Sequence, residues 1–163
     1  MVTGGVLVDH LNTSVLALTV EYLGPVSIPF PALKPYSLAA ELCENLGVEV
    51  TEPAPEQLYS AATAVRSSTR VVSFEERLCQ IVAGGSKRTV LGDNRLLKTL
   101  CDENGVPFCF GPELMDRLVR HGRLARREAL RIERARQQRR SLLIGVTSSS
   151  RLRLGRTGGG RRP

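Results

Sequence analysis

Short apolar runs rich in β-branched residues alternate along the chain with longer segments in which apolar residues recur every three or four positions. The runs have the length and composition of buried strands and lie at 5–8, 26–30, 48–53, 88–94 and 106–110. The segments with helical periodicity lie at 14–22, 36–46, 55–65, 73–83, 95–103 and 111–122, and an arginine-rich one follows from Arg126 to Arg139.

Local signals agree with this division into strands and helices. Ser73 followed three positions later by Glu76 is the capping-box pattern of a helix start, and Pro55 stands where a helix tolerates proline best. Strands that alternate with helices predict βαβ units, hence an α/β fold with a small parallel sheet flanked by helices on both faces. We expect Val6–Val8 and Val90–Leu91 to be its central strands.

Composition indicates one globular domain over 1–140, followed by a disordered tail over 141–163. The chain is 42% hydrophobic and 24% charged, whereas its last residues are mostly glycine, serine and arginine. Its apolar runs are far shorter than the roughly 18 residues of a membrane span, and Asp9 and His10 interrupt the first run too early for a secretory signal. Four cysteines without metal-ligand spacing predict buried free thiols and a cytoplasmic protein.

Charge is distributed unevenly along the chain. Residues 1–119 carry nine basic and 14 acidic side chains, a net charge of −5, whereas residues 120–163 carry 14 arginines and two glutamates, a net charge of +12. A basic segment of this kind favours a polyanionic partner, most often a nucleic acid, although an acidic protein or a merely solvated tail is also compatible with it.

Three carboxylates stand where a parallel sheet places its ligand site. Asp9 follows the first predicted strand, Asp93 follows the run at 88–91 after one glycine, and Glu76 lies at the start of a helix. Because ligands bind outside the carboxyl ends of parallel strands, these residues should converge there and share a hard cation, Mg²⁺ or Mn²⁺. Each also has a structural interpretation: a strand end for Asp9, a capping box for Glu76 and a turn for Asp93.

Three segments together, VLVDHLN, VVSFEERLCQIVAG and TVLGDNRLLKTLCDENGVPFCFGPELMDRLVRHGRL, resemble a PIN-domain protein over about residues 5–138. The resemblance is most specific between Ser73 and Leu124. It implies a small parallel sheet flanked by helices, and many family members are metal-dependent ribonucleases, in bacteria often the toxin of a toxin–antitoxin pair. Matched by position, Asp9, Glu76 and Asp93 would be the catalytic and metal-binding acids.

One acid of the family pattern is missing. After the strand that ends in Ile-Pro, Lys34 or Pro35 stands where a glutamate is usual. Either Glu41 or Glu44 substitutes for it, with Glu41 as a weak candidate ligand, or the metal site is incomplete. The Lys34 ammonium could also take the place of a cation and hold the acids together.

Two functions from different classes follow. The first is a metal-dependent endoribonuclease that acts on RNA and is neutralised by an antitoxin-type protein. The second is a catalytically inactive PIN-like domain that binds RNA or a protein through its basic C-terminal region. A small Rossmann-like binding module is a third hypothesis, which no ligand-binding loop supports. The candidates for holding phosphates are Arg95, Lys98, Arg126, Arg127 and Arg131. A membrane partner is not expected, and a homodimer is left open.

Overall fold

The protein is a mixed α/β chain whose strands pair in parallel. The computed structural model describes residues 1–69 and 71–137, and the tail predicted over 141–163 lies outside them. The chain divides into two compact units, Met1–Arg123 and Leu124–Pro163. In the part of the chain that the structure describes, no helix is long and apolar enough to cross a membrane.

The first unit contains all the named strands and helices. In chain order they are α1 (Gly4–Asn12), α2 (Leu16–Leu23), β1 (Val26–Pro29), the 3₁₀ helix η1 (Phe30–Tyr36), α3 (Ala40–Asn45), β2 (Val48–Thr51), α4 (Pro55–Ser67), α5 (Phe74–Gly85), β3 (Val90–Gly92), α6 (Arg95–Glu103), β4 (Phe108–Phe110) and α7 (Gly111–Arg120). In the second unit, residues 126–137 are helical.

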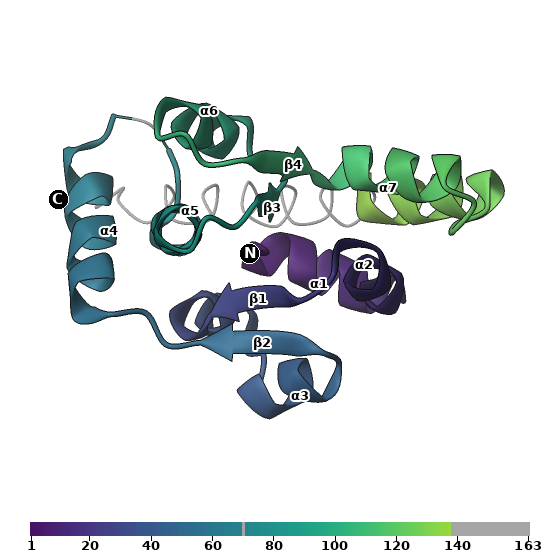
Figure 1. Ribbon diagram of the computed structural model, residues 1–163, viewed down its shortest axis with the longest axis horizontal. Coiled ribbons are helices and arrows are strands. Elements are labelled where there is room, and N and C mark those ends of the chain that lie inside the picture. Colours follow the sequence, from purple (N-terminus) through teal and green to yellow (C-terminus); the bar gives the residue numbers. More distant parts are fainter. Residues whose placement is uncertain (70, 138–163) are drawn as a thin grey trace, which may run out of the picture. The chain divides into compact units, whose positions relative to one another are not determined.

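Two parallel strand pairs are joined through the first three residues of the chain (Figure 1). β1 pairs with β2, and β3 pairs with β4. Val2 forms a parallel bridge with Leu91 and donates its backbone N–H to the carbonyl of Ser27 at 2.8 Å, while Thr3 donates to the carbonyl of Leu91 at 3.0 Å. Residues 1–3 therefore lie between β1 and β3 and hydrogen-bond to both pairs.

The prediction of a strand at Val6–Val8 is wrong, because these residues belong to α1. The position between β1 and β3 is taken by residues 1–3, and the helix begins directly after them at Gly4. Gly4, Val6, Leu7 and His10 are the buried residues of α1, a spacing that places them on one side of a helix. A run as short as GVLV has no periodicity that separates a strand from a buried helical turn.

Most other predicted elements are confirmed. β1, β2, β3 and β4 fall within the predicted runs, and α6 has the predicted bounds. Ser73 caps α5: its Oγ accepts the N–H of Glu76 and the Glu76 carboxylate accepts the N–H of Ser73, both at 3.2 Å. This reciprocal pair satisfies two of the donors that every helix start leaves free.

The helix predicted over 36–46 is shorter in the structure. The segment up to Tyr36 is 3₁₀, Ser37 has a left-handed backbone with φ of 53°, and α3 begins only at Ala40. The left-handed backbone at Ser37 accounts for the later start, because an α-helix cannot continue through a residue with a positive φ.

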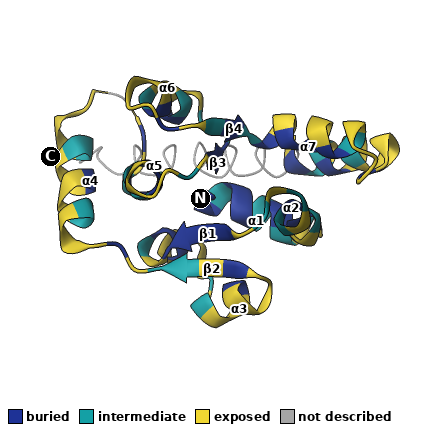
Figure 2. Ribbon diagram, in the orientation of Figure 1, coloured by how far each residue is buried: buried dark blue, intermediate teal, exposed yellow. Residues whose placement is uncertain are grey.

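The core is built from aliphatic side chains and four free cysteines, all buried (Figure 2). Its largest fully buried aliphatic side chains include Leu7, Ile28, Leu33, Leu78 and Leu97. The prediction of buried free thiols is therefore confirmed. Burial raises the pKa of the Cys79 thiol to about 12 and that of Cys101 to about 11, so neither thiol is suited to nucleophilic chemistry at neutral pH.

Candidate functional site

The start of α5 meets the carboxyl end of β3 through a contact between Glu76 and Asn94. Asp93 follows β3 directly, and its neighbour Asn94 caps α6 by accepting the N–H of Leu96 at 2.9 Å. The Asn94 amide also donates to the Glu76 carboxylate at 2.9 Å. This hydrogen bond joins the start of α5 to the residue next to Asp93, and convergence of the carboxylates of Asp9, Glu76 and Asp93 stays a prediction.

The carboxylates of Glu76 and Asp93 each accept hydrogen bonds that connect separate elements of the fold. One oxygen of Glu76 accepts both the Ser73 N–H and the Asn94 amide, and so ties the starts of α5 and α6 together. One oxygen of Asp93 accepts the N–H of Gly111 at 3.2 Å. This N–H lies at the start of α7, where the helix dipole stabilises a negative charge. The structural interpretations given for these acids are thus present in the molecule.

Asp9 does not follow a strand, since it lies in the second half of α1. Its charge nevertheless reaches the same neighbourhood. Burial raises the pKa of the Tyr36 hydroxyl, and the negative charges of Glu76, Glu75 and Asp9 raise it further. The Tyr36 hydroxyl is therefore within electrostatic range of acidic side chains on both α1 and α5, and we call its surroundings the acidic region.

Tyr36 and Gly4 are the residues of this region that sequence reasoning missed. A Cβ added at Gly4 would lie 2.3 Å from Cε2 of Tyr36 and 2.7 Å from the carbonyl oxygen of Ala32, so the ring packs directly on the glycine. At Gly5 an added Cβ would lie 3.3 Å from the Tyr36 hydroxyl. The pair Gly4-Gly5 at a helix start was the only signal in the sequence for this close approach.

The structure gives Lys34 a contact of its own and places Glu41 on α3. The Lys34 Nζ lies over the ring of Phe30, 5.7 Å from its centroid, so a cation–π contact accounts for its position. Glu41 is exposed in the first turn of α3, and α3 packs on β2, whereas α5 packs on β1, β3, η1, α4 and α6.

Glu76 and Asp93 were expected to share a metal ion with Asp9. Among residues 1–69 and 71–137, no three His, Cys, Asp or Glu side chains form a group that could hold a metal ion. One oxygen each of Glu76 and Asp93 is already an acceptor for the fold's own donors. Because a carboxylate oxygen that accepts a hydrogen bond can still ligate a hard cation, the binding of Mg²⁺ or Mn²⁺ by Asp9, Glu76 and Asp93 stays a prediction.

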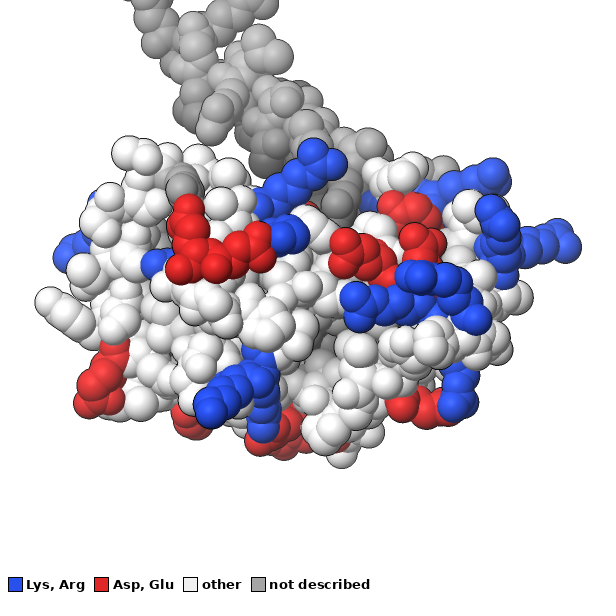
Figure 3. Space-filling model, turned by 45° about the horizontal axis from the view of Figure 1, so that its top comes forward, with Lys and Arg blue, Asp and Glu red and all other residues white. Residues whose placement is uncertain are grey.

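The predicted phosphate-binding residues fall into two groups. Arg95 and Lys98 lie on α6 in the first unit, where Lys98 forms an ion pair with Asp102. On the face shown in Figure 3, acidic and basic side chains of the described residues form small separate groups. The face shown in Figure 3 is therefore mixed in sign and does not by itself favour a polyanion.

The second group lies on the helix at 126–137. Arg126, Arg127, Arg131 and Arg134 are all exposed, and three of them, at positions 127, 131 and 134, line one hollow of about 680 Å³. Spacings of four and three residues place these three side chains on the same helix face. Glu128 pairs with Arg131 at 2.7 Å and offsets part of this charge.

Comparison of the chain with protein-family models, with curated proteins and with solved structures finds no match. What the chain does is therefore argued from its own residues.

Proposed function

We propose that the chain is a PIN-like domain that binds RNA through the arginines of its C-terminal region. The observation that carries this proposal is the row Arg127, Arg131 and Arg134, exposed on one helix face within a segment of net charge +12. At 1.5 Å per residue the row is about 10 Å long, enough to contact more than one phosphate of a nucleic-acid strand.

The energetics of the row favour a polyanionic partner. Like charges three and four residues apart destabilise a helix by about 0.2–0.5 kcal/mol per pair. The ion pair between Arg131 and Glu128 offsets only part of this repulsion in the free protein. A phosphate backbone converts the same repulsion into attraction and releases counterions, which makes binding depend steeply on salt. Aromatic residues are only 4% of the chain, so we expect contacts to phosphates rather than stacking on bases.

The fold supports the PIN-like part of the proposal. The parallel order β2, β1, residues 1–3, β3 and β4, with helices between the strands, agrees with the small parallel sheet that the sequence resemblance implies. The arginines at 126–137 would form the basic C-terminal helix.

The test is the salt dependence of binding to a single-stranded RNA oligonucleotide, measured by fluorescence anisotropy. The slope of log Kobs against log salt is negative. The variant R127Q/R131Q/R134Q should reduce its magnitude by about 2, since each lost phosphate contact contributes about 0.7 for a single strand. The matched control K34Q/R66Q/K87Q removes three exposed charges from the first unit and should leave the slope unchanged. Equal slopes for the two triple variants, or binding to an acidic protein but not to RNA, would overturn the proposal.

RNA cleavage that requires Mg²⁺ or Mn²⁺ is the second candidate, favoured by the contact that brings Glu76 next to the end of β3. Asp93→Asn and Glu76→Gln each keep an oxygen acceptor for the hydrogen bonds described above, so both variants should stay folded. Cleavage that needs added Mn²⁺ and is lost in both variants would support this candidate. Intact RNA after incubation of wild-type protein with Mn²⁺ would eliminate it and leave the binding proposal standing.

A further inference from the structure

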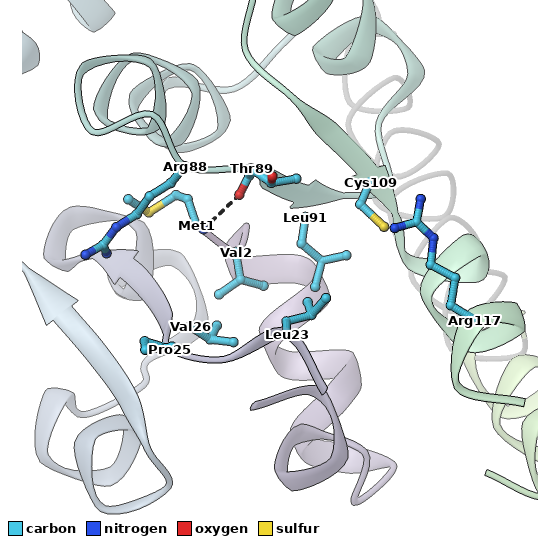
Figure 4. A pocket seen from close by; sticks show the side chains of 10 residues that line it. All are labelled: Met1, Val2, Leu23, Pro25, Val26, Arg88, Thr89, Leu91, Cys109 and Arg117. Carbon is cyan, nitrogen blue, oxygen red and sulfur yellow. Dashed lines mark hydrogen bonds between the residues drawn. The ribbon is translucent and has the colours of Figure 1, made fainter. Parts of the chain in front are cut away.

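A pocket of about 390 Å³ opens at the beginning of β1 and β3, at the amino ends of the strands (Figure 4). It lies entirely within the first unit. Its lining residues are Met1, Val2, Leu23, Pro25, Val26, Arg88, Thr89, Leu91, Cys109 and Arg117. Because Asp93 and the contact between Asn94 and Glu76 lie at the carboxyl end of β3, this pocket at the amino ends is a separate site.

The walls of the pocket are apolar and its charges have a single sign. Val2, Val26 and Leu91 are buried side chains that form its apolar side, and Leu23, 43% exposed, stands at its opening. The charged side chains that line it are Arg88 and Arg117, and no Asp or Glu is among the described lining residues.

The two arginines differ in their partners. The Arg88 guanidinium donates to Ser27 Oγ and to the Glu49 carboxylate at 2.9 Å, so its charge is compensated within the fold. Arg117 pairs with no carboxylate within residues 1–69 and 71–137, and its guanidinium extends toward Cys109 at the pocket wall (Figure 4). Arg117 is therefore a side-chain cation of the pocket that no carboxylate of the described residues compensates, and it lies next to apolar surface.

We propose that this pocket binds a small organic anion with an apolar body, such as a medium-chain carboxylate, with its carboxylate on Arg117 and its chain against Val2, Val26 and Leu91. The planar guanidinium binds a carboxylate through two parallel hydrogen bonds, which fixes the orientation of the ligand. A concave, mostly apolar pocket of this volume with few polar groups is typical of small-molecule sites. The site depends neither on a metal ion nor on RNA.

The test is calorimetric titration of the full-length chain with decanoate, and with decanol as the neutral compound of the same chain length. Arg117→Gln should weaken decanoate binding at least tenfold and leave decanol binding unchanged. Arg120→Gln is the matched control, because it removes an exposed charge from the same helix at a residue that does not line the pocket. Leu23→Asn should weaken the binding of both compounds, because it replaces apolar surface at the opening.

Three results would overturn the proposal: decanoate binding that Arg117→Gln does not change, equal losses for Arg117→Gln and Arg120→Gln, or an Arg117 variant that weakens RNA binding but not decanoate binding. The variants Glu76→Gln, Asp93→Asn and R127Q/R131Q/R134Q should bind decanoate as the wild type does. Failure of this inference is therefore distinguishable from failure of the proposed function. Circular dichroism spectra of all variants check that each is folded.

Discussion

Replacing Gly4 with alanine tests how closely Tyr36 packs on the start of α1. The added Cβ would lie 2.3 Å from the Tyr36 ring and 2.7 Å from the Ala32 carbonyl oxygen, both far inside van der Waals contact. The ring can rotate away because Tyr36 is 43% exposed, but the carbonyl belongs to the backbone of η1 and can shift only with it. Overpacking of this kind costs about 1–3 kcal/mol of the free energy of unfolding.

Gly5 provides the matched control one position later in the same helix. Its added Cβ meets only the Tyr36 hydroxyl, at 3.3 Å, so Gly5→Ala should stabilise the helix by about 0.5 kcal/mol through the lower backbone entropy of alanine. Gly4→Ala should therefore lower, and Gly5→Ala raise, the midpoint of thermal unfolding, by about 2–4 °C for each kcal/mol.

A double-mutant cycle separates the two contacts. In a Tyr36→Ala background, the cost of Gly4→Ala should be smaller but should not vanish, because the Ala32 carbonyl remains. Urea unfolding followed by circular dichroism gives the four free energies. If Gly4→Ala and Gly5→Ala have the same stability, the packing of Tyr36 on Gly4 is refuted.

Three further predictions concern stability. Ser73→Ala should cost about 1 kcal/mol because it removes the α5 cap, whereas Ser60→Ala on the exposed face of α4 should be nearly neutral in the same urea titration, and equal effects would contradict the role of the cap. Leu97→Ala should cost about 2–5 kcal/mol and Leu96→Ala under about 1 kcal/mol, since Leu97 is fully buried and Leu96 is 41% exposed; a reversed order would show that α6 presents its other face to the core. Burial raises the pKa of the Cys79 thiol from 9.0 to about 12, so its contribution to stability is complete below about pH 9 and is lost as the pH rises toward 12. Unfolding free energies measured across this range should fall less steeply for Cys79→Ala than for the wild type, and parallel curves would disprove the shift.

Local patterns in the sequence determined most of the elements. The capping box at Ser73 and Glu76 fixed the start of α5, because both of its hydrogen bonds form within four consecutive residues. Asn94 marks the start of α6 in the same way, through its bond to the N–H of Leu96. The alternation of apolar runs and helical segments predicted parallel pairing, and both strand pairs are parallel.

Tertiary structure decided the beginning of the chain and, with it, the place of Asp9. The run GVLV suits a buried strand and a buried helical turn equally well, and the choice depended on which residues make ladder hydrogen bonds to Ser27 and Leu91. Residues 1–3 make those bonds, so Gly4 begins a helix and Asp9 lies within that helix rather than directly after a strand. No local pattern contains this information, because the partners lie more than 20 residues away.

The environment of the acids was likewise beyond the sequence. The sequence pattern led us to expect Glu76 and Asp93 at the same strand end, but it did not predict that the amide of Asn94 would donate to Glu76 or that the N–H of Gly111 would donate to Asp93. Nor did it show that Tyr36 would fill the space beside Gly4. These contacts join segments that are far apart in the chain. Residue type alone does not specify them, because each forms only when the folded molecule packs the two segments against each other.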